Sequence, residues 1–354
     1  MKQFIGYSIT GNVNEAVRGL ENPKAVIILS GKDYFAKTVK EVSKMFPEAH
    51  VIGCVGQSYA ESTINLEGIT IVGFCGNILV QGGVIKNVRE MPLASIRSIR
   101  KAMREVNAQE ENTFCLDFTC GNDAALVSTL NMVLSEQNIS LVGGTAWEDT
   151  VAYGKHIYHD AAVFLFVKNL DGKIRTYKEN LYSANENARR FSASKVDPKN
   201  CIIYELDGHP VDMVYMKSLG ITEDKISTQT FENPLGRWIG NEIYLISIEE
   251  RVENHGLKCY KKVNPMDIIS IMQLQNYPAI IQGTIRQIQR DFPNISGIFS
   301  INCLFRYLLF EDKGFTKTYF DTMAALAPHA GLIGLGEHFN TQHINQTMSC
   351  VVFG

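Results

Sequence analysis

Short apolar runs recur along the chain, each bounded by polar or glycine-containing segments, and they predict buried β-strands. They form three groups of three runs, and the segment between the first and second run of each group predicts a helix. The predicted helices are Tyr34–Phe46, Asp123–Glu136 and Thr316–Ala327. The predicted strands are Ala25–Leu29, Val51–Val55, Ile69–Phe74, Phe114–Phe118, Ser140–Val142, Ala161–Val167, Ile298–Ile301, Gly331–Leu335 and Met348–Phe353.

The three groups resemble one another in more than their order of elements. The second strand of each group ends in a similar sequence: VIGCVG, LVGGTA and GLIGLGE. A polar loop then leads to the third strand, which starts 16 residues after Gly53, 17 after Gly144 and 14 after Gly334. An ordinary α/β protein also alternates strands and helices, but matching glycines and loop lengths favour three copies of one β-α-β-β unit.

The strands predict an α/β fold with mixed sheets. Runs such as AVIIL, AVFLFV and SCVVF are apolar on both faces, so both faces must be covered. Helices can cover one face, and a second sheet or further helices the other. The direct link from second to third strand makes each sheet mixed rather than purely parallel.

A segment of different pattern, Glu179–Pro265, separates the second and third copies, and it contains the polar stretch SANENARRFSASKVDPKN. We therefore predict two domains with a boundary near residues 185–200. Residues 1–190 would hold two copies, and residues 191–354 would hold the third.

Composition narrows the class of protein. The 354 residues include 34 Lys and Arg against 37 Asp and Glu, and a net charge of −3 argues against nucleic-acid binding. No apolar run is long enough to span a membrane, and the N-terminus lacks the apolar core of a signal peptide, so we expect a cytoplasmic protein. Its eight cysteines should then be thiols. No two have CxxC spacing, and no metal site is predicted.

The polar loops after the second strands are the candidate ligand-binding segments, because ligands often bind where strands end in glycine turns. They are Gly56–Thr63, Gly143–Thr150 and Gly336–Thr347. Glu148 and Asp149 could receive an amine, whereas the third loop offers many hydrogen-bonding side chains. The candidate ligand-binding residues of the second and third loops are Thr145, Glu148, Asp149, Glu337, Asn340, His343, Asn345 and Thr347.

Cys303 and Arg306 follow the first strand of the third copy. Both are candidate ligand-binding residues, and Arg306 could hold a carboxylate through its planar fork of donors. Cys303, with His343 as base and Asn345 as orienting group, could form the trio of a cysteine-dependent hydrolase. The favoured interpretation is structural: Cys303 is a buried cysteine, and Arg306 pairs with a carboxylate such as Glu337.

The run Gly331–Gly336 is not a dinucleotide-binding fingerprint, because its glycines follow a helix and lead to a polar loop. Two further histidines, His156 and His159, could ligate a metal or haem, although surface histidines beside a strand are the simpler interpretation.

Several segments in order along the chain resemble the FIST family, named for F-box and intracellular signal transduction proteins. Val51–Cys54 and Leu141–Asp149 resemble blocks of the family's N-terminal region. The resemblance to its C-terminal region rests on Tyr204–Pro210, Asn233–Arg237, the pair Cys303 and Arg306, and the closing text GLIGLGEHFNTQHINQTMSCVVFG. The chain departs from the family at Trp147, where a small residue is usual.

The resemblance implies an intracellular sensory protein that binds a small ligand, with amino acids or their derivatives proposed. We expect it to be non-enzymatic. Some members are haem-containing nitric-oxide sensors, which makes His156, His159 and His343 the alternative haem ligands. Because the last predicted strand runs to the final residues, we expect a sensor whose output lies in a separate protein. Kinases, chemotaxis transducers and cyclic-nucleotide enzymes are the expected partners.

Overall fold

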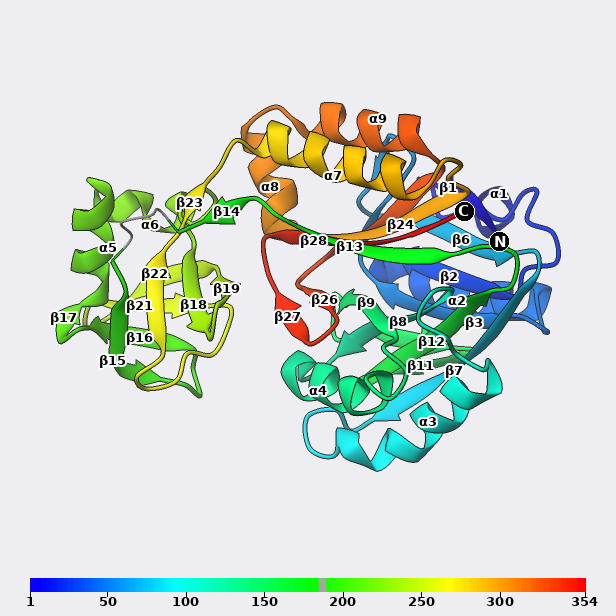
Figure 1. Cartoon of the computed structure of the whole chain (residues 1–354), viewed down its shortest axis with the longest axis horizontal. Coiled ribbons are helices and arrows are strands. Elements are labelled where there is room, and N and C mark those ends of the chain that lie inside the picture. Colours follow the sequence, from blue (N-terminus) through cyan, green and yellow to red (C-terminus); the bar gives the residue numbers. More distant parts are fainter. Residues whose placement is uncertain (185–188) are drawn as a thin grey trace. The chain divides into compact units, whose positions relative to one another are not determined.

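A computed structural model describes residues 1–184 and 189–354, and their contacts form two compact units (Figure 1). The first unit contains Met1–Glu179, Gln282–His343 and Thr347–Gly354. The second contains Asn180–Ile281 and Ile344–Gln346. Parallel and antiparallel strands share sheets that are covered by helices, which confirms the predicted α/β class with mixed sheets.

The three predicted groups of strands share one topology within the first unit. In each, the first strand lies between the other two, parallel to the second and antiparallel to the third. The first group is β2 (Ala25–Ser30), α2 (Lys32–Met45), β3 (His50–Val55) and β6 (Ile69–Cys75). The second is β8 (Thr113–Cys120), α4 (Asp123–Leu134), β9 (Ser140–Thr145) and β12 (Ala161–Asn169). The third is β24 (Gly297–Cys303), α8 (Leu304–Asp312), α9 (Thr316–Leu326), β25 (His329–Gly334) and β28 (Thr347–Phe353).

The polar segments between second and third strands are largely β-hairpins, where the sequence predicts loops. They are β4 (Gln57–Ala60) with β5 (Thr63–Asn65), β10 (Val151–Tyr153) with β11 (His156–Tyr158), and β26 (Glu337–Phe339) with β27 (Gln342–Ile344). Each hairpin pairs with the second strand of another group. Strand β10 pairs with β3, β26 with β9, and β4 with β25. The three sheets are thus linked in a closed ring, and we call each pairing a junction.

One further strand completes the opposite edge of each sheet, so that every sheet of the ring has six strands. These outer strands are β1 (Lys2–Ser8), β7 (Ile78–Lys86) and β13 (Ile174–Asn180). They pair with β6, β12 and β28 respectively.

The inner faces of the three sheets share one apolar core. Aromatic rings from different groups meet edge to face there, with centroids 6.4 Å apart for Phe118 and Phe299 and 5.8 Å apart for Phe74 and Phe353. The strands are apolar on both faces because their inner faces pack in this shared core and their outer faces pack against helices.

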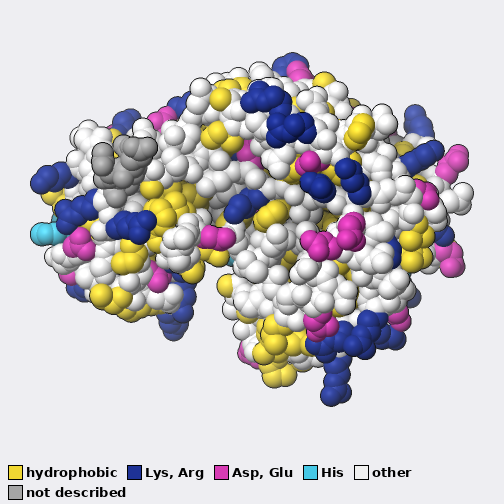
Figure 2. Space-filling view, viewed as in Figure 1, with side chains coloured by type: hydrophobic (Ala, Val, Ile, Leu, Met, Phe, Trp, Pro, Cys, Tyr) yellow, Lys and Arg dark blue, Asp and Glu magenta, His cyan; other side chains and the backbone are white. Residues whose placement is uncertain are grey.

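Helices cover the outer faces of the sheets. Helix α2 packs on the first sheet with α1 (Val13–Ala16), and α4 packs on the second with α3 (Ile96–Glu105), which follows the 3₁₀ turn Pro92–Ser95. Helix α8 packs on β24 and β25, and α7 (Tyr277–Asp291) precedes β24 in the chain (Figure 1). Lys and Arg side chains gather over α3 (Figure 2). Among the helices of the described residues, none is both long and apolar enough to cross a membrane.

The second unit has its own apolar core around a mixed set of short strands and helices. Its strands are β14 (Tyr182–Ser183), β15 (Phe191–Asp197), β16 (Ile202–Leu206), β17 (His209–Pro210), β18 (Leu235–Ile239), β19 (Glu242–Ile246), β20 (Ile248–Val252), β21 (Gly256–Cys259), β22 (Ile268–Ile271) and β23 (Gln273–Leu274). Its helices are α5 (Val211–Leu219) and α6 (Ile226–Gln229), with the 3₁₀ turn Glu223–Lys225.

Contacts divide the chain differently from the two consecutive segments 1–190 and 191–354. The third copy packs with the first two because ring closure requires all three sheets, so the second unit is inserted between β13 and β24. The predicted boundary segment includes residues 185–188, which lie outside the described residues. As a boundary between family regions, residue 190 stays a prediction.

A glycine occupies the corresponding position of each junction, where the hairpin crosses the second strand. Gly53 pairs with Ala152, Gly143 with His338, and Gly331 with Tyr59. A Cβ atom on Gly331 would lie 1.8 Å from the carbonyl oxygen of Ser300. On Gly143 it would lie 1.7 Å from Oδ1 of Asp117, and on Gly53 it would lie 2.6 Å from the carbonyl oxygen of Ile28.

Substitution Gly331→Ala should therefore destabilise the protein by about 3 kcal/mol, because the backbone of β24 must move to admit the methyl group. A matched control is Gly283→Ala in α7, where a Cβ has no heavy atom within 4 Å. This change should stabilise the helix by about 0.5–1 kcal/mol. Urea unfolding of both variants measures the two effects, and equal free energies of unfolding would contradict the tight junction.

Candidate functional site

A cluster of ionisable side chains lies at the junction of β26 with β9. Asp117 projects from β8, and His338 projects from β26 beside Gly143. Asp123 begins α4 after a link of two residues from β8, and the side chain of Asn122 caps the helix by accepting a hydrogen bond from the Ala125 amide at 3.1 Å. His343 on β27 completes the cluster.

His338 lies between two carboxylates. Its Nδ1 is 2.8 Å from Oδ2 of Asp117, and its Nε2 is 3.0 Å from Oδ1 of Asp123. The hydroxyl of Thr145 donates to the same Asp123 oxygen at 2.6 Å. The ring of His343 stands edge-on to that of His338, with centroids 5.4 Å apart. Since both carboxylates accept hydrogen bonds, the arrangement suits a His338 ring with protons on both nitrogens.

Electrostatic interactions in this cluster favour the charged forms of His338 and Asp123. Burial alone would lower the pKa of His338, but Asp117 and Asp123 outweigh it and raise the pKa to about 10. Burial opposes the charge of Asp123, yet His343, His338 and Thr145 hold its pKa below the usual range. Burial raises the pKa of Asp117, and His338 only partly offsets that effect. At neutral pH His338 is therefore a buried cation.

The other two junctions hold different chemistry at the corresponding positions. In the first, Ala152 and Ile28 replace His338 and Asp117, and the junction is apolar. In the third, Tyr59 and Ser300 replace them, and the Tyr59 hydroxyl donates to the Ser300 carbonyl oxygen at 2.8 Å. The same backbone arrangement thus forms with apolar, neutral or ionisable side chains. The fold does not require the charges at the second junction, which points to a functional role for them.

Two of the predicted ligand-binding residues, Thr145 and His343, belong to the cluster. Glu337 and Thr347 are buried, and the Thr347 hydroxyl donates to Oε2 of Glu337 at 2.9 Å. Asn340 accepts a hydrogen bond from the Leu141 amide at 3.1 Å, which fastens the third hairpin to the second sheet. Asn345 is buried and belongs to the second unit.

Arg306 and Cys303 lie in the interior of the first unit. Arg306 forms an ion pair with Glu179, rather than with Glu337 as suggested from the sequence, and its Nε donates to Asn302 at 3.0 Å. Its guanidinium also lies over the ring of Phe310 at 4.8 Å. The favoured structural interpretation, an arginine paired with a carboxylate beside a buried cysteine, describes this arrangement.

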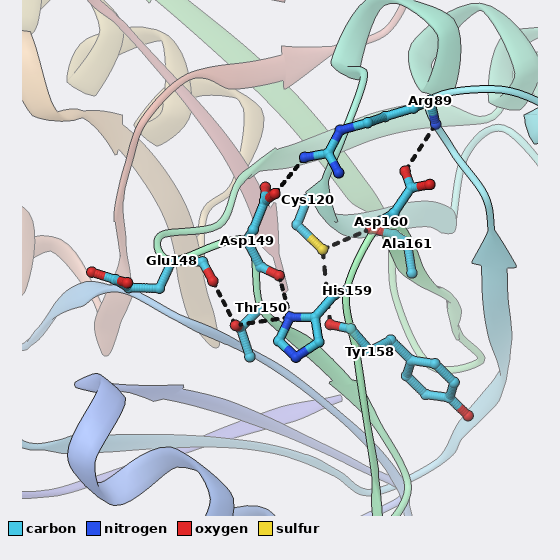
Figure 3. Close-up of polar contacts among 9 residues, drawn as sticks. All are labelled: Arg89, Cys120, Glu148, Asp149, Thr150, Tyr158, His159, Asp160 and Ala161. Carbon is cyan, nitrogen blue, oxygen red and sulfur yellow. Dashed lines mark hydrogen bonds and ion pairs between the residues drawn. The ribbon is translucent and has the colours of Figure 1, made fainter.

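Glu148 and Asp149 lie on the surface in left-handed backbone conformations, with φ of 54° and 48°. Their side chains point in different directions (Figure 3). Asp149 forms an ion pair with Arg89, whereas Glu148 binds Nζ of Lys32 at 2.9 Å.

Glu148 lines an open cavity of about 340 Å³. The start of α2 lines one part of it, and the segments that follow β3 and β9 line another. The indole nitrogen of Trp147 donates to the Ile333 carbonyl oxygen at 2.8 Å, which fixes the ring at the cavity wall. The lining residues are Gly31, Lys32, Asp33, Tyr34, Val55, Gly56, Gln57, Leu66, Glu67, Trp147 and Glu148.

The alternative haem ligands have polar surroundings. His156 is exposed on β11, and Nδ1 of His159 lies 2.7 Å from the carbonyl oxygen of Asp149 (Figure 3). His343 lies among Asp123 and His338. A haem needs an apolar slot around its porphyrin, and these surroundings do not fit one.

Sequence reasoning missed several residues that the structure brings to these two places. Lys32, Asp33 and Glu67 line the cavity but precede the predicted loops or follow them. The sequence pattern does not point to Asp123, whereas Asp117, a lone acidic residue inside the apolar strand TFCLDFTC, is a usable signal. His338 lay within the third loop, and only its position opposite Asp117 sets it apart.

Glu179→Gln should lower the free energy of unfolding by about 3–5 kcal/mol, because it leaves the Arg306 charge buried without its partner. The double variant Glu179→Leu with Arg306→Met should recover most of that loss. As a control, Asp321→Asn removes the exposed partner of Lys317 and should change stability little. Urea unfolding tests all three, and a small effect of Glu179→Gln would contradict a structural role for Arg306.

His329, at the third junction, should make the protein less stable in acid. Burial lowers the pKa of this histidine to about 3, so below pH 6.5 the unfolded chain binds a proton that the folded chain does not. Between pH 7 and pH 5 the expected loss is about 2 kcal/mol. His329→Gln should remove this contribution, and exposed His156→Gln should keep it. Urea unfolding at several pH values measures the difference, and parallel curves for His329→Gln and the wild type would disprove it.

Comparison with known proteins places the chain in a family. The FIST N domain matches residues 24–209, more than half of the chain. The match covers the first two groups of strands, both hairpins that they contribute and the start of the second unit. A search of the curated proteins finds no match. The resemblance of later segments to the family's C-terminal region stays a prediction. The chain belongs to the FIST family of sensory domains and has a general sensory role in signal transduction.

Proposed function

We propose that this protein is a non-enzymatic sensor of an amino acid or another small carboxylate, which binds in the cavity beside Glu148. The observation that carries the proposal is the lining of that cavity. The segments after β3 and β9 meet the start of α2 there, and the lining includes one lysine, Lys32, and three carboxylates, those of Asp33, Glu67 and Glu148. Its volume of about 340 Å³ lies within the range of small-molecule sites.

The charges of the cavity suit a zwitterion. Lys32 offers an ammonium group to a carboxylate, and the amides at the start of α2 also favour a negative charge. Glu148, Asp33 and Glu67 can accept hydrogen bonds from an amine. On binding, the ion pair of Lys32 and Glu148 would open, and each partner would bind one end of the ligand. Trp147 would supply an apolar surface for the ligand side chain.

Ligand binding would be read by a separate output protein, such as a kinase, a chemotaxis transducer or a cyclic-nucleotide enzyme. The cavity wall includes Trp147, whose indole contacts the third sheet through Ile333. A ligand that prefers one position of this segment would shift the population of conformations that the partner meets. The proposal includes no metal-dependent or covalent step at this cavity.

Glu148→Gln should weaken amino-acid binding by about 10–100-fold, because a hydrogen bond between charged groups contributes about 1.5–3 kcal/mol. Asp149→Asn is the matched control, since Asp149 is adjacent, ion-paired and exposed but does not line the cavity. Binding is measured by calorimetry after a thermal-shift screen of amino acids and small carboxylates on the full chain. Equal weakening by both variants, or no ligand from the screen, would contradict the proposal.

Two alternatives remain predictions with simple tests. For a haem sensor, the purified protein supplemented with haem should keep a Soret band after gel filtration, and a colourless protein would exclude it. For a hydrolase, an activity probe should label Cys303 and lose that labelling in Cys303→Ala but not in Cys54→Ala. The buried positions of both thiols argue against such labelling.

A further inference from the structure

The geometry points to a site for a divalent transition metal, zinc or ferrous iron, formed by Asp123, His338 and His343. One candidate ligand atom from each residue lies within 4.8 Å of the others. Two imidazoles and one carboxylate are a ligand set that both metals accept. This site is separate from the cavity beside Glu148, so it goes beyond the proposed function.

The three side chains need only a small movement to hold an ion. With bonds of about 2.1 Å, tetrahedral ligand atoms lie about 3.4 Å apart. Nε2 of His338 and Oδ1 of Asp123 are already 3.0 Å apart. His343 is only partly buried on the short strand β27, so its ring can turn toward the other two. The metal would take the place of the proton between Nε2 and Asp123, and that proton would pass to solvent.

The residues that hydrogen-bond to the proposed ligands are already arranged as metal sites require. Asp117 lies 2.8 Å from Nδ1 of His338, and this contact directs Nε2 toward Asp123. Thr145 donates to Asp123 and fixes that carboxylate. Oδ1 of Asp117 is buried without a hydrogen-bond partner among the described residues, because it lies against Gly143. A carboxylate in this position is costly unless the imidazole in front of it carries a positive charge or a metal.

Comparison of the junctions supports a specific site rather than a general feature of the fold. Ala152 at the first junction has no donor atom for a metal, and Tyr59 at the third is occupied by hydrogen bonds to Ser300 and Asn302. Three protein ligands would leave coordination positions open for water or a signal molecule, as in catalytic sites and unlike closed structural sites.

The test uses the full chain, treated with EDTA and dialysed, then titrated with Zn²⁺ against a chromogenic chelator. We expect one zinc ion per chain. Replacing a ligand, by His343→Gln or Asp123→Asn, should weaken affinity at least about 100-fold, since changes behind the ligands already cost 10–100-fold. The double variant His156→Gln with His159→Gln is the control for surface histidines and should bind as the wild type does. Co²⁺ in place of zinc should give the visible absorption of tetrahedral coordination, and His343→Gln should lose it.

Circular dichroism and unfolding in EDTA establish that each variant is folded, and His343→Gln is the decisive one because its side chain is only partly buried. Equal zinc affinity of His343→Gln and the wild type would overturn the proposal. So would loss of binding in the surface double variant, or no stoichiometric binding at all. Amino-acid binding is measured in EDTA with Glu148→Gln. The proposals for the metal site and for the sensory cavity are therefore tested independently of each other.

Discussion

The first unit depends on main-chain pairing between each hairpin and the sheet of another group. Strands β4, β10 and β26 add to β25, β3 and β9, and in doing so they cover edges that would otherwise expose unpaired backbone groups. The pairing also closes the ring, which brings three apolar sheet faces onto one core. No single sheet could bury its inner face alone, so the three groups stabilise one another.

Close approach at the junctions leaves room for variation in side-chain chemistry. Because Gly53, Gly143 and Gly331 carry no side chain, the neighbouring strands can present other groups in the space that a Cβ would fill. The first junction is apolar, the third is a neutral hydrogen-bonded network, and the second holds a histidine between two carboxylates. The three junctions share one backbone arrangement but differ in their side chains. The comparison therefore distinguishes the residues that the fold needs from those that are available for binding.

Both proposed binding places lie beside junctions. The cavity lined by Trp147 and Glu148 lies where the segment after β9 leads into β10, which pairs with β3. The cluster of Asp123, His338 and His343 lies where the next hairpin pairs with β9. A ligand at either proposed place would contact two groups of the ring at once. Such contacts would let binding change how neighbouring sheets pack, as the proposed sensory mechanism requires.

The sequence by itself determined the strands, because apolar runs on both faces have few alternatives to a covered sheet, and Ala25–Leu29 and Phe114–Phe118 lie within observed strands. It also identified Thr145 and His343 among polar residues after glycine turns. It could not place Asp117, Asp123 and His338 together, since their contact arises from pairing between β26 and β9, about 200 residues apart in the chain. Each hairpin pairs with one of several similar sheet edges, and only the tertiary packing determines which edge that is.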